Sequence, residues 1–196
     1  MKVVIGLVGK PLSGKETVGT MLIERIQNTG KIAHRRRFRD ILEHTLTKWD
    51  IECNRANLQK LAQIMVTEGA FGPNALSHAV YNYFIRDSAD VVIADGVRWL
   101  SDEKMIRDIP NNKGILLYIS SNQETRFARA HARQREGEHN LTREQFLIED
   151  SATTETSIDA IGLRADWTIY NEDGITLEKL KKRVDDFFTM LVLPRL

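Results

Sequence analysis

The chain has 196 residues, of which 42% are hydrophobic and 28% are charged, and its formal net charge at pH 7 is +1. This length and composition suit one domain with a sizeable core, and the small net charge gives no overall electrostatic case for binding a nucleic acid or an anionic membrane. The single cysteine, Cys53, excludes an intrachain disulfide, and no apolar stretch approaches the roughly 20 residues that a membrane helix needs. We therefore expect a soluble, cytoplasmic protein.

The first predicted elements are a strand, a glycine-rich loop and a helix. The apolar run from Val3 to Val8 predicts a strand that is buried on both faces of a parallel sheet. The loop from Gly9 to Lys15 reads G-x-x-x-x-G-K, and an amphipathic run that ends at Gly30 follows it. In this context the loop N–H groups and the helix N-terminus form a concave anion site, so the sequence predicts a phosphate loop at residues 9–15.

A basic strand and a helical stretch come next. Residues 31–37 predict the second strand, and helical patterns follow at residues 38–49, 54–69 and 76–86. Because these helices separate the second strand from the third, we interpret residues 38–87 as a region that holds a phosphate acceptor. The basic cluster at its start either anchors an acceptor phosphate or protects an edge strand from aggregation, and it contains Arg36, Arg37, Arg39 and Asp40.

The second half of the chain alternates strands and helices. Residues 90–94, 115–119 and 167–170 predict strands, and helical patterns cover residues 102–109, 122–135, 143–154 and 177–191. With right-handed crossovers, this order predicts a three-layer α/β/α sandwich with a five-stranded parallel sheet. We expect a single domain with its core at residues 1–37, 88–121 and 160–196, a helical region at about 38–87 and a lid at about 122–155.

The phosphate loop contains the strongest candidates for nucleotide binding. Lys15 stands where the lysine of such a loop neutralises the β and γ phosphates of a nucleoside triphosphate. Gly9, Ser13 and Gly14 belong to the same loop. Thr17 lies in the first turn of the helix, where it can bond the α-phosphate or simply cap or cover the helix.

Two carboxylates are candidates for Mg²⁺. Glu16 stands where a residue with a hydroxyl group usually binds the metal. Three interpretations are open: Glu16 holds Mg²⁺ directly or through water, it only complements the helix dipole, or its presence impairs phosphate hydrolysis or transfer. Asp95 follows the third strand, at the sheet edge where ligands gather, and either holds the metal or forms an ordinary Asp-Gly turn. Arg98, three residues further on, is placed to clamp a phosphate with two parallel hydrogen bonds.

Arginines of the predicted lid share one helix face. Arg126, Arg129 and Arg133 are spaced i, i+3 and i+7. Guanidinium groups on a closing hairpin can stabilise charge on a transferred phosphoryl group, and Arg129 and Arg133 are the better candidates. An exposed, salt-bridged helix face is the alternative.

These motifs resemble those of nucleotide kinases of the phosphate-loop superfamily, most of all the branch of dephospho-coenzyme A kinase and deoxynucleoside monophosphate kinase. Residues 13–17 read S-G-K-E-T, close to the S-G-K-D/E-T of that branch, so Glu16 is a feature of the lineage in this interpretation. Residues 95–98 resemble its D-G-x-R strand end, and residues 124–129 resemble its lid helix.

The resemblance also implies two further sets of contacts. Asn171 and Gly174 belong to the stretch whose backbone lies against the adenine, and Asp40, Arg55 and Gln59 line the acceptor pocket. Glu43 and His44 stand where a basic residue often follows the F-x-D-x-L element, so the kinase class is better supported than the acceptor.

Residues and resemblance together predict a nucleotide kinase that uses ATP and Mg²⁺ to phosphorylate a nucleoside or deoxynucleoside monophosphate. Dephospho-coenzyme A is the second acceptor, and a nucleotide-binding regulatory protein without transferase activity is the alternative from another class. The predicted partner is thus a small-molecule nucleotide, with no nucleic acid and no membrane, and the oligomeric state is left open. The predicted catalytic residues are Lys15, Arg98, Arg129 and Arg133, with Arg129 also a contact of ATP.

Overall fold

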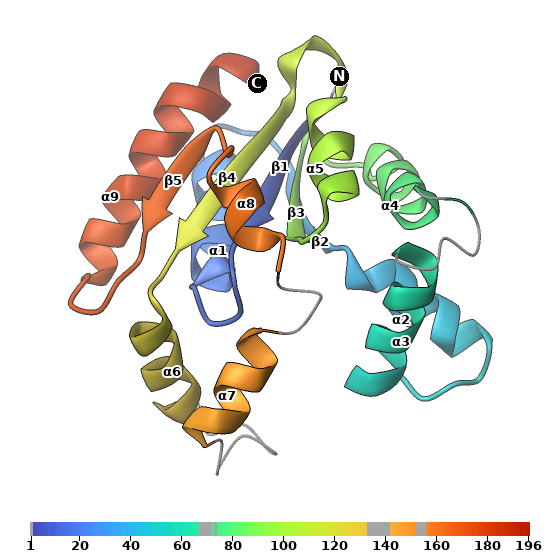
Figure 1. Cartoon of the computed structure of the whole chain (residues 1–196). Helices are drawn as coiled ribbons and strands as arrows, with labels where there is room; N and C mark the ends of the chain where they lie inside the picture. The colour runs from blue at the N-terminus through green and yellow to red at the C-terminus, as the bar shows by residue number, and fades with distance from the viewer. Residues whose placement is uncertain (1, 67–71, 73, 133–141, 152–155) are drawn as a thin grey trace.

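The computed structural model describes residues 2–66, 72, 74–132, 142–151 and 156–196. Its five strands are β1 (Val3–Val8), β2 (Ala33–Arg37), β3 (Val91–Val97), β4 (Gly114–Ser120) and β5 (Trp167–Tyr170). They form one sheet in the order β2-β3-β1-β4-β5, and every pairing is parallel (Figure 1). The predicted α/β/α sandwich with a five-stranded parallel sheet is confirmed.

Nine α-helices cover the sheet or extend beyond it in the described part of the chain. They are α1 (Lys15–Gln27), α2 (Arg39–Lys48), α3 (Arg55–Val66), α4 (Ala75–Ile85), α5 (Leu100–Arg107), α6 (Gln123–Ala132), α7 (Arg143–Asp150), α8 (Ile158–Gly162) and α9 (Leu177–Phe187). A 3₁₀ turn spans Pro110–Asn112, and α9 continues through a π-helical turn, Phe188–Val192, into a last 3₁₀ turn, Leu193–Arg195. None of the described helices has the length and apolar character that spanning a membrane requires.

The central strand β1 decides how the two helical layers pack. All six of its residues are buried, and its side chains alternate between the two faces of the sheet. Val3, Ile5 and Leu7 pack into the cluster formed with α1 and α9, whereas Val4 and Val8 pack into the cluster formed with α5 and α8. Burial on both faces explains why β1 is apolar throughout instead of alternating with polar residues.

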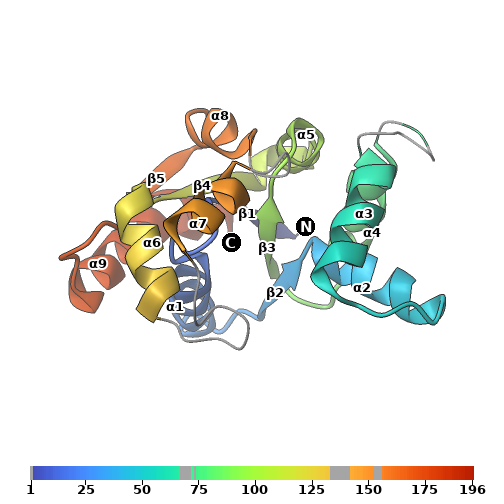
Figure 2. The ribbon, with the colours of Figure 1, turned by 60° about the horizontal axis from the view of Figure 1, so that its bottom comes forward.

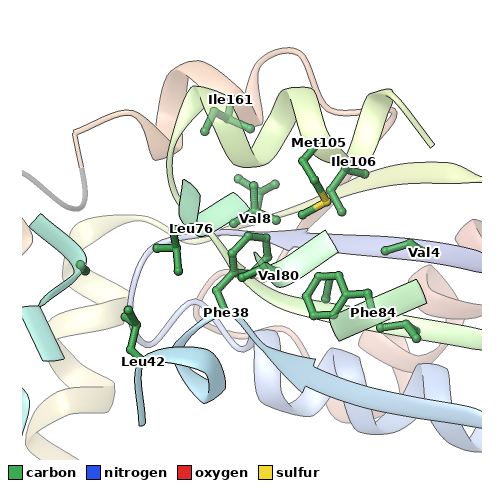
Figure 3. Packing of buried hydrophobic residues seen from close by; sticks show 14 of the residues in the cluster. Val4, Val8, Phe38, Leu42, Leu76, Val80, Phe84, Met105, Ile106 and Ile161 are labelled. Atoms are coloured by element: carbon green, nitrogen blue, oxygen red, sulfur yellow. The ribbon is translucent and has the colours of Figure 1, made fainter. Parts of the chain in front are cut away.

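The helical region α2–α4 packs onto the second of these clusters (Figure 3). Phe38 and Phe84 meet edge to face, with ring centroids 5.5 Å apart, and Leu76 belongs to the same cluster as Val4 and Val8. This region therefore shares its apolar core with the sheet, and α2 follows directly from the carboxyl end of β2.

The structure corrects one strand boundary that matters for the site. The predicted third strand ends at residue 94, but β3 runs to Val97, so Asp95 lies within the strand and pairs with Leu7 of β1 and Arg37 of β2. Gly96 forms a bulge opposite Leu7 and Val8, with a φ angle of 101°. The sequence-based boundary is wrong because Asp and Gly normally end strands, whereas here pairing on both sides extends β3.

Candidate active site

The phosphate loop leaves the carboxyl end of β1 and enters α1. Gly9 and Gly14 have φ angles of 153° and 98°, which favour glycine. A Cβ atom on Gly9 would lie 2.7 Å from the carbonyl oxygen of Ile119, and one on Gly14 would lie 2.2 Å from Nδ2 of Asn171. The loop therefore requires both glycines, and it ends at the N-terminus of α1, where backbone N–H groups and the helix dipole attract anions.

Lys15 is held over the loop to which it belongs. Its Nζ atom donates hydrogen bonds to the carbonyl oxygens of Gly9, at 2.6 Å, and of Lys10, at 2.9 Å. A cation at the start of a helix is opposed by the helix dipole, and these carbonyl groups offset that repulsion. The ammonium group thus stays at the anion-binding end of α1.

Other loop residues differ in their access to a ligand. Ser13 is 1% exposed, and its Oγ atom has no hydrogen-bond partner among the described residues. Glu16 and Thr17 are exposed in the first turn of α1. Within the described ranges no three His, Cys, Asp or Glu side chains gather as a metal site. Ser13 therefore faces the protein interior, whereas Glu16 and Thr17 are open to solvent.

Asn171 and Arg129 connect the end of β5 and helix α6 to this loop. The Nδ2 atom of Asn171 donates to the Ser13 carbonyl oxygen at 2.8 Å. The guanidinium of Arg129 donates to the carbonyl oxygens of Leu12, at 3.1 Å, and of Asn171, at 2.9 Å. Burial lowers the pKa of Arg129, although Glu172 and Asp173 act in the opposite direction. Residues over 100 positions apart in sequence thus converge on the loop.

Gly174 lies in the turn beyond Asn171. Its φ angle is 76°, and a Cβ atom there would meet no atom within 4 Å. This position needs glycine for its backbone conformation and not for close packing.

The burial of Arg126 contradicts the alternative interpretation of an exposed, salt-bridged helix face for this residue. The residue is 3% exposed, and its guanidinium forms a two-pronged ion pair with Asp150 of α7 and donates to the Ser121 carbonyl oxygen at 3.1 Å. Burial raises the pKa of Asp150, but hydrogen bonds from Arg126 and Gln123 outweigh it and keep that pKa below its usual range. Arg126 therefore joins α6 to α7. Arg133 lies outside the described residues.

Asp95 forms an ion pair that the sequence analysis did not anticipate. Arg35 of β2 donates a hydrogen bond from Nε to Oδ2 of Asp95 at 3.2 Å, and its Nη2 atom donates a second hydrogen bond to the same oxygen. A Cβ atom on Gly19 of α1 would lie 3.5 Å from Cδ of Arg35, so this arginine lies against α1. In the sheet Arg37 lies in register with Asp95, and Arg35, two residues earlier, is on the same face of β2. The alternation of side chains along β2 was therefore the available signal for the ion pair between Arg35 and Asp95.

Arg98 lies in a turn that is fixed by a buried carboxylate, Asp102. The backbone N–H groups of Arg98 and Trp99 donate to Oδ2 of Asp102 at 3.0 and 3.1 Å, and Oδ1 has no partner among the described residues. Burial raises the pKa of Asp102 to about 7, although these two hydrogen bonds and the Arg98 charge act in the opposite direction. Asp102 was not among the residues predicted from the sequence. The available signal was its place as an acidic residue at the third position of α5, where a carboxylate can cap the N-terminus of the helix.

Predicted acceptor residues are engaged with one another near the start of α2. Asp40 accepts hydrogen bonds from the backbone N–H and from Nε of Arg37, both at 2.8 Å. Glu43 pairs with Arg37 and Arg39, and Arg36 donates to Asp87 at 2.6 Å. These local ion pairs favour the interpretation of the basic cluster as a protected edge strand.

The remaining acceptor candidates lie on α3. Gln59 is exposed, and the side chain of Arg55 lies outside the described part of the chain. A pocket of about 150 Å³ lies among α2, α3 and α4 and is lined by Ile41, Leu42, Thr45, Trp49, Leu61, Met65 and Leu76. Its lining contains none of the predicted acceptor residues, so this pocket is not the predicted acceptor site.

No protein-family model matches this chain, and a search of curated proteins also found no match. Solved structures do match it along nearly its whole length. The shikimate kinase of Bacteroides thetaiotaomicron superimposes with a TM-score of 0.61 at 13% sequence identity, covering 99% of each chain. The shikimate kinase of Acinetobacter baumannii in complex with shikimate gives a TM-score of 0.54 at 17% identity, covering 100% of this chain and 96% of that one.

A third structure is a kinase named for a different small molecule. The Mycobacterium tuberculosis APS kinase CysC, in complex with AMPPNP and APS, superimposes with a TM-score of 0.53 at 15% identity, covering 96% of this chain and 98% of that one. The chain has the fold of these P-loop kinases. At such low identities the likeness establishes the fold and leaves the reaction and the acceptor to be argued from the site.

The P-loop kinase fold explains why the candidate residues meet. The strand order reverses beside β1, and parallel α/β sheets bind ligands in the crevice at the carboxyl ends of the strands near such a point. Figure 2 shows this edge with α6 and α7 on one side and α2–α4 on the other. The phosphate loop, the end of β3 and the residue after β5 all lie at this edge.

Proposed function

We propose that this protein is an ATP- and Mg²⁺-dependent phosphotransferase, with a nucleoside or deoxynucleoside monophosphate as the first-choice acceptor. The observation that carries the proposal is the phosphate loop at the carboxyl end of β1, with Lys15 Nζ 2.6 Å from the Gly9 carbonyl oxygen and Arg129 bonded to the same loop. Structures of the same fold support it, because they are shikimate kinases and an APS kinase, and the APS kinase was solved with AMPPNP bound.

The residues of the site would act by positioning and by electrostatic stabilisation. The N–H groups at the start of α1 and the Lys15 ammonium would hold the donor phosphates and balance their charge. Arg98, in the turn fixed by Asp102, and Arg129 and Arg133 of the lid would stabilise charge on the phosphoryl group as it moves. Lid closure would exclude water, which would otherwise compete with the acceptor.

Glu16 and Asp95 are the proposed Mg²⁺ residues, and an oxygen-only donor set suits this hard cation. When bound, Mg²⁺ would neutralise charge on the phosphate oxygens. Glu16 is exposed at the start of α1, and both bonds from Arg35 end on the same oxygen of Asp95, Oδ2. Glu16→Gln should lower Mg²⁺-dependent turnover more than ATP affinity, and equal losses in both would count against a metal role.

The proposed division of the domain follows the chain. Residues 1–37, 88–121 and 160–196 would form the core that binds ATP, residues 38–87 would hold the acceptor, and residues 122–155 would form the lid. In the acceptor region, Gln59 and Arg55 would contact the acceptor. Asp40 is bonded by Arg37, so it would act by fixing this arginine.

A transfer assay tests the proposal. The purified protein would be mixed with ATP and Mg²⁺ and offered nucleoside monophosphates, deoxynucleoside monophosphates, dephospho-coenzyme A and shikimate, with product formation followed by chromatography. Lys15→Ala is the control, because it removes the ammonium group and keeps the backbone of the loop. Phosphorylation of a nucleoside monophosphate by the unaltered protein alone is the expected result.

Other outcomes would redirect the assignment. Transfer to dephospho-coenzyme A would replace the first-choice acceptor by the second. Tight ATP binding with no transfer to any acceptor, and any residual ATP turnover unchanged in Lys15→Ala, would overturn the kinase assignment in favour of a nucleotide-binding regulatory protein.

A further inference from the structure

We propose that Asn171 is a positioning residue of the phosphate loop: its side-chain amide sets the orientation of the peptide between Ser13 and Gly14, and thereby the affinity of the loop for a nucleoside triphosphate. The inference rests on the proposed function, because it applies only if the loop binds a triphosphate. It gives Asn171 a role distinct from contact with the adenine.

The first support is the rigidity with which Asn171 is held. The residue is 6% exposed; its backbone N–H donates to the Ser120 carbonyl oxygen at 2.8 Å, and its own carbonyl oxygen accepts from Arg129 at 2.9 Å. Its Nδ2 atom then donates to the Ser13 carbonyl oxygen at 2.8 Å, in a buried hydrogen bond between residues 158 positions apart. The amide is thus a fixed support on the buried side of the loop.

The second support is the geometry of the peptide unit. In a trans peptide the C=O and N–H groups point in opposite directions. The structure contains no cis peptide bond among the described residues. When Asn171 holds the Ser13 carbonyl on the buried side, the N–H of Gly14 must point away from it, toward the open side. Gly14 directly precedes α1, whose first N–H groups form the anion site.

The third support is the close approach at Gly14. A Cβ atom on this residue would lie 2.2 Å from Nδ2 of Asn171, closer than any real contact. The φ angle of 98° alone would favour glycine, but the nearby amide also leaves no room for a side chain. The glycine before Lys15 and the asparagine after β5 are therefore one structural unit, although the sequence motif contains only the glycine.

The side chain of Ser13 points to the same conclusion. It is 1% exposed, and its hydroxyl lacks a hydrogen-bond partner among the described residues. Ser13 thus contributes to the loop through its carbonyl group, which Asn171 holds, and not through a hydroxyl directed at a ligand.

The test is Asn171→Ala in the full chain, with ATP as the probe in calorimetric titration and with steady-state kinetics. We expect the Kd and KM for ATP to rise at least tenfold, while the KM for the acceptor changes less than twofold. If the alanine variant does not fold, Asn171→Leu keeps the branched shape of the side chain at this buried position and removes the amide donor, with the same expected result.

Thr176→Ala is the matched control for a general loss of stability. Thr176 lies five residues further on, and its hydroxyl caps α9 by accepting from the Lys179 N–H at 3.3 Å, away from the loop. This variant should lower Tm without changing the Kd for ATP. A comparable loss of ATP affinity in Thr176→Ala would overturn the positioning role of Asn171.

A double variant tests the unit directly. A side chain at residue 14 would displace the amide, so Asn171→Ala should cause little further loss of ATP affinity when added to Gly14→Ala. Additive losses, or an unchanged Kd in Asn171→Ala, would overturn the inference while the proposed function stands. Failure of the unaltered protein to bind ATP would overturn the proposed function and this inference with it.

Discussion

The phosphate loop and the β2–β3 edge of the sheet use their charged residues differently. At the loop, Lys15 and Arg129 donate hydrogen bonds to neutral backbone carbonyl groups. At the β2–β3 edge and the start of α2, Arg35 and Arg37 form ion pairs with Asp95 and Asp40. An ion pair cancels much of the charge of a cation, whereas a hydrogen bond to a neutral carbonyl group does not. Because the loop also ends at the N-terminus of α1, we expect an anion to bind there.

The largest expected effect is at the phosphate loop. Lys15→Met should lower kcat/KM for ATP by roughly 100- to 1000-fold, the usual loss when one charge-stabilising donor is removed from a reaction centre. Lys10→Met is the control, because this second lysine of the loop forms ion pairs instead. Its Nζ atom lies 3.3 Å from Oδ2 of Asp159 and 3.6 Å from Oδ2 of Asp150. Steady-state kinetics of both variants measure the effect. Equal losses of kcat/KM in the two variants would contradict a special role for Lys15.

The next effect concerns the buried ion pair between α6 and α7. Asp150→Ala should destabilise the protein by about 3–5 kcal/mol, because it leaves the Arg126 guanidinium buried without its partner. Both side chains are nearly inaccessible, at 4% and 6% exposure. Urea unfolding followed by circular dichroism measures the change. Stability within about 1 kcal/mol of the unaltered protein would contradict a structural role for this pair, since exposed pairs contribute no more than that.

A smaller effect depends on pH and on the turn that carries Arg98. Burial raises the pKa of Asp102 from 3.8 to about 7. The folded protein therefore binds this proton more tightly than the unfolded chain, so the contribution is fully present below about pH 4 and is lost as the pH rises through about 7. The free energy of unfolding should thus decrease by about 3 kcal/mol between pH 5 and pH 8 through this group.

Asp102→Asn isolates this contribution, because an amide keeps an acceptor for the Arg98 and Trp99 N–H groups but does not titrate in this range. Urea unfolding of both proteins at several pH values gives the difference. The variant should lose less stability than the unaltered protein as the pH rises, and parallel curves would show that Asp102 does not titrate in this window.

The smallest effect distinguishes two roles of Asp95. Arg35→Met removes a partly buried partner and should reduce stability by about 1 kcal/mol. If Asp95 also serves Mg²⁺, loss of the competing guanidinium should lower the Mg²⁺ concentration needed for half-maximal turnover. If the Mg²⁺ requirement does not change, the ion pair between Arg35 and Asp95 is only a structural contact between β2 and β3. Arg25→Met is the control, because it breaks an exposed ion pair with Asp185.

The fold followed from the sequence because the buried strands contain apolar runs and most helices have their own periodicity. These signals are local, and β1 is buried on both faces as its composition predicts. The short helix α8, Ile158–Gly162, was not predicted, because five residues are too few to show a helical period. The end of β3 was misplaced because pairing with β1 and β2 overrides the local preference of Asp95 and Gly96 for a turn.

The site was predictable only where its residues are neighbours in sequence. The spacing of Gly9, Gly14 and Lys15 is sufficient to predict a phosphate loop. Periodicity placed Arg126 and Arg129 on neighbouring positions of one helix face. It could not show that Arg126 is buried in an ion pair with Asp150, which belongs to another helix. Such pairs depend on how separate elements pack.

By itself, the sequence determined the layers, the strands and the loop with its lysine, since chain connectivity and hydrophobic periodicity act over a few residues. Only the tertiary structure decided which charges meet. It paired Arg35 with Asp95, Arg126 with Asp150 and the Asn171 amide with the Ser13 carbonyl. The physical reason is that a buried polar group needs a partner, and the partner nearest in space is set by packing and not by distance along the chain.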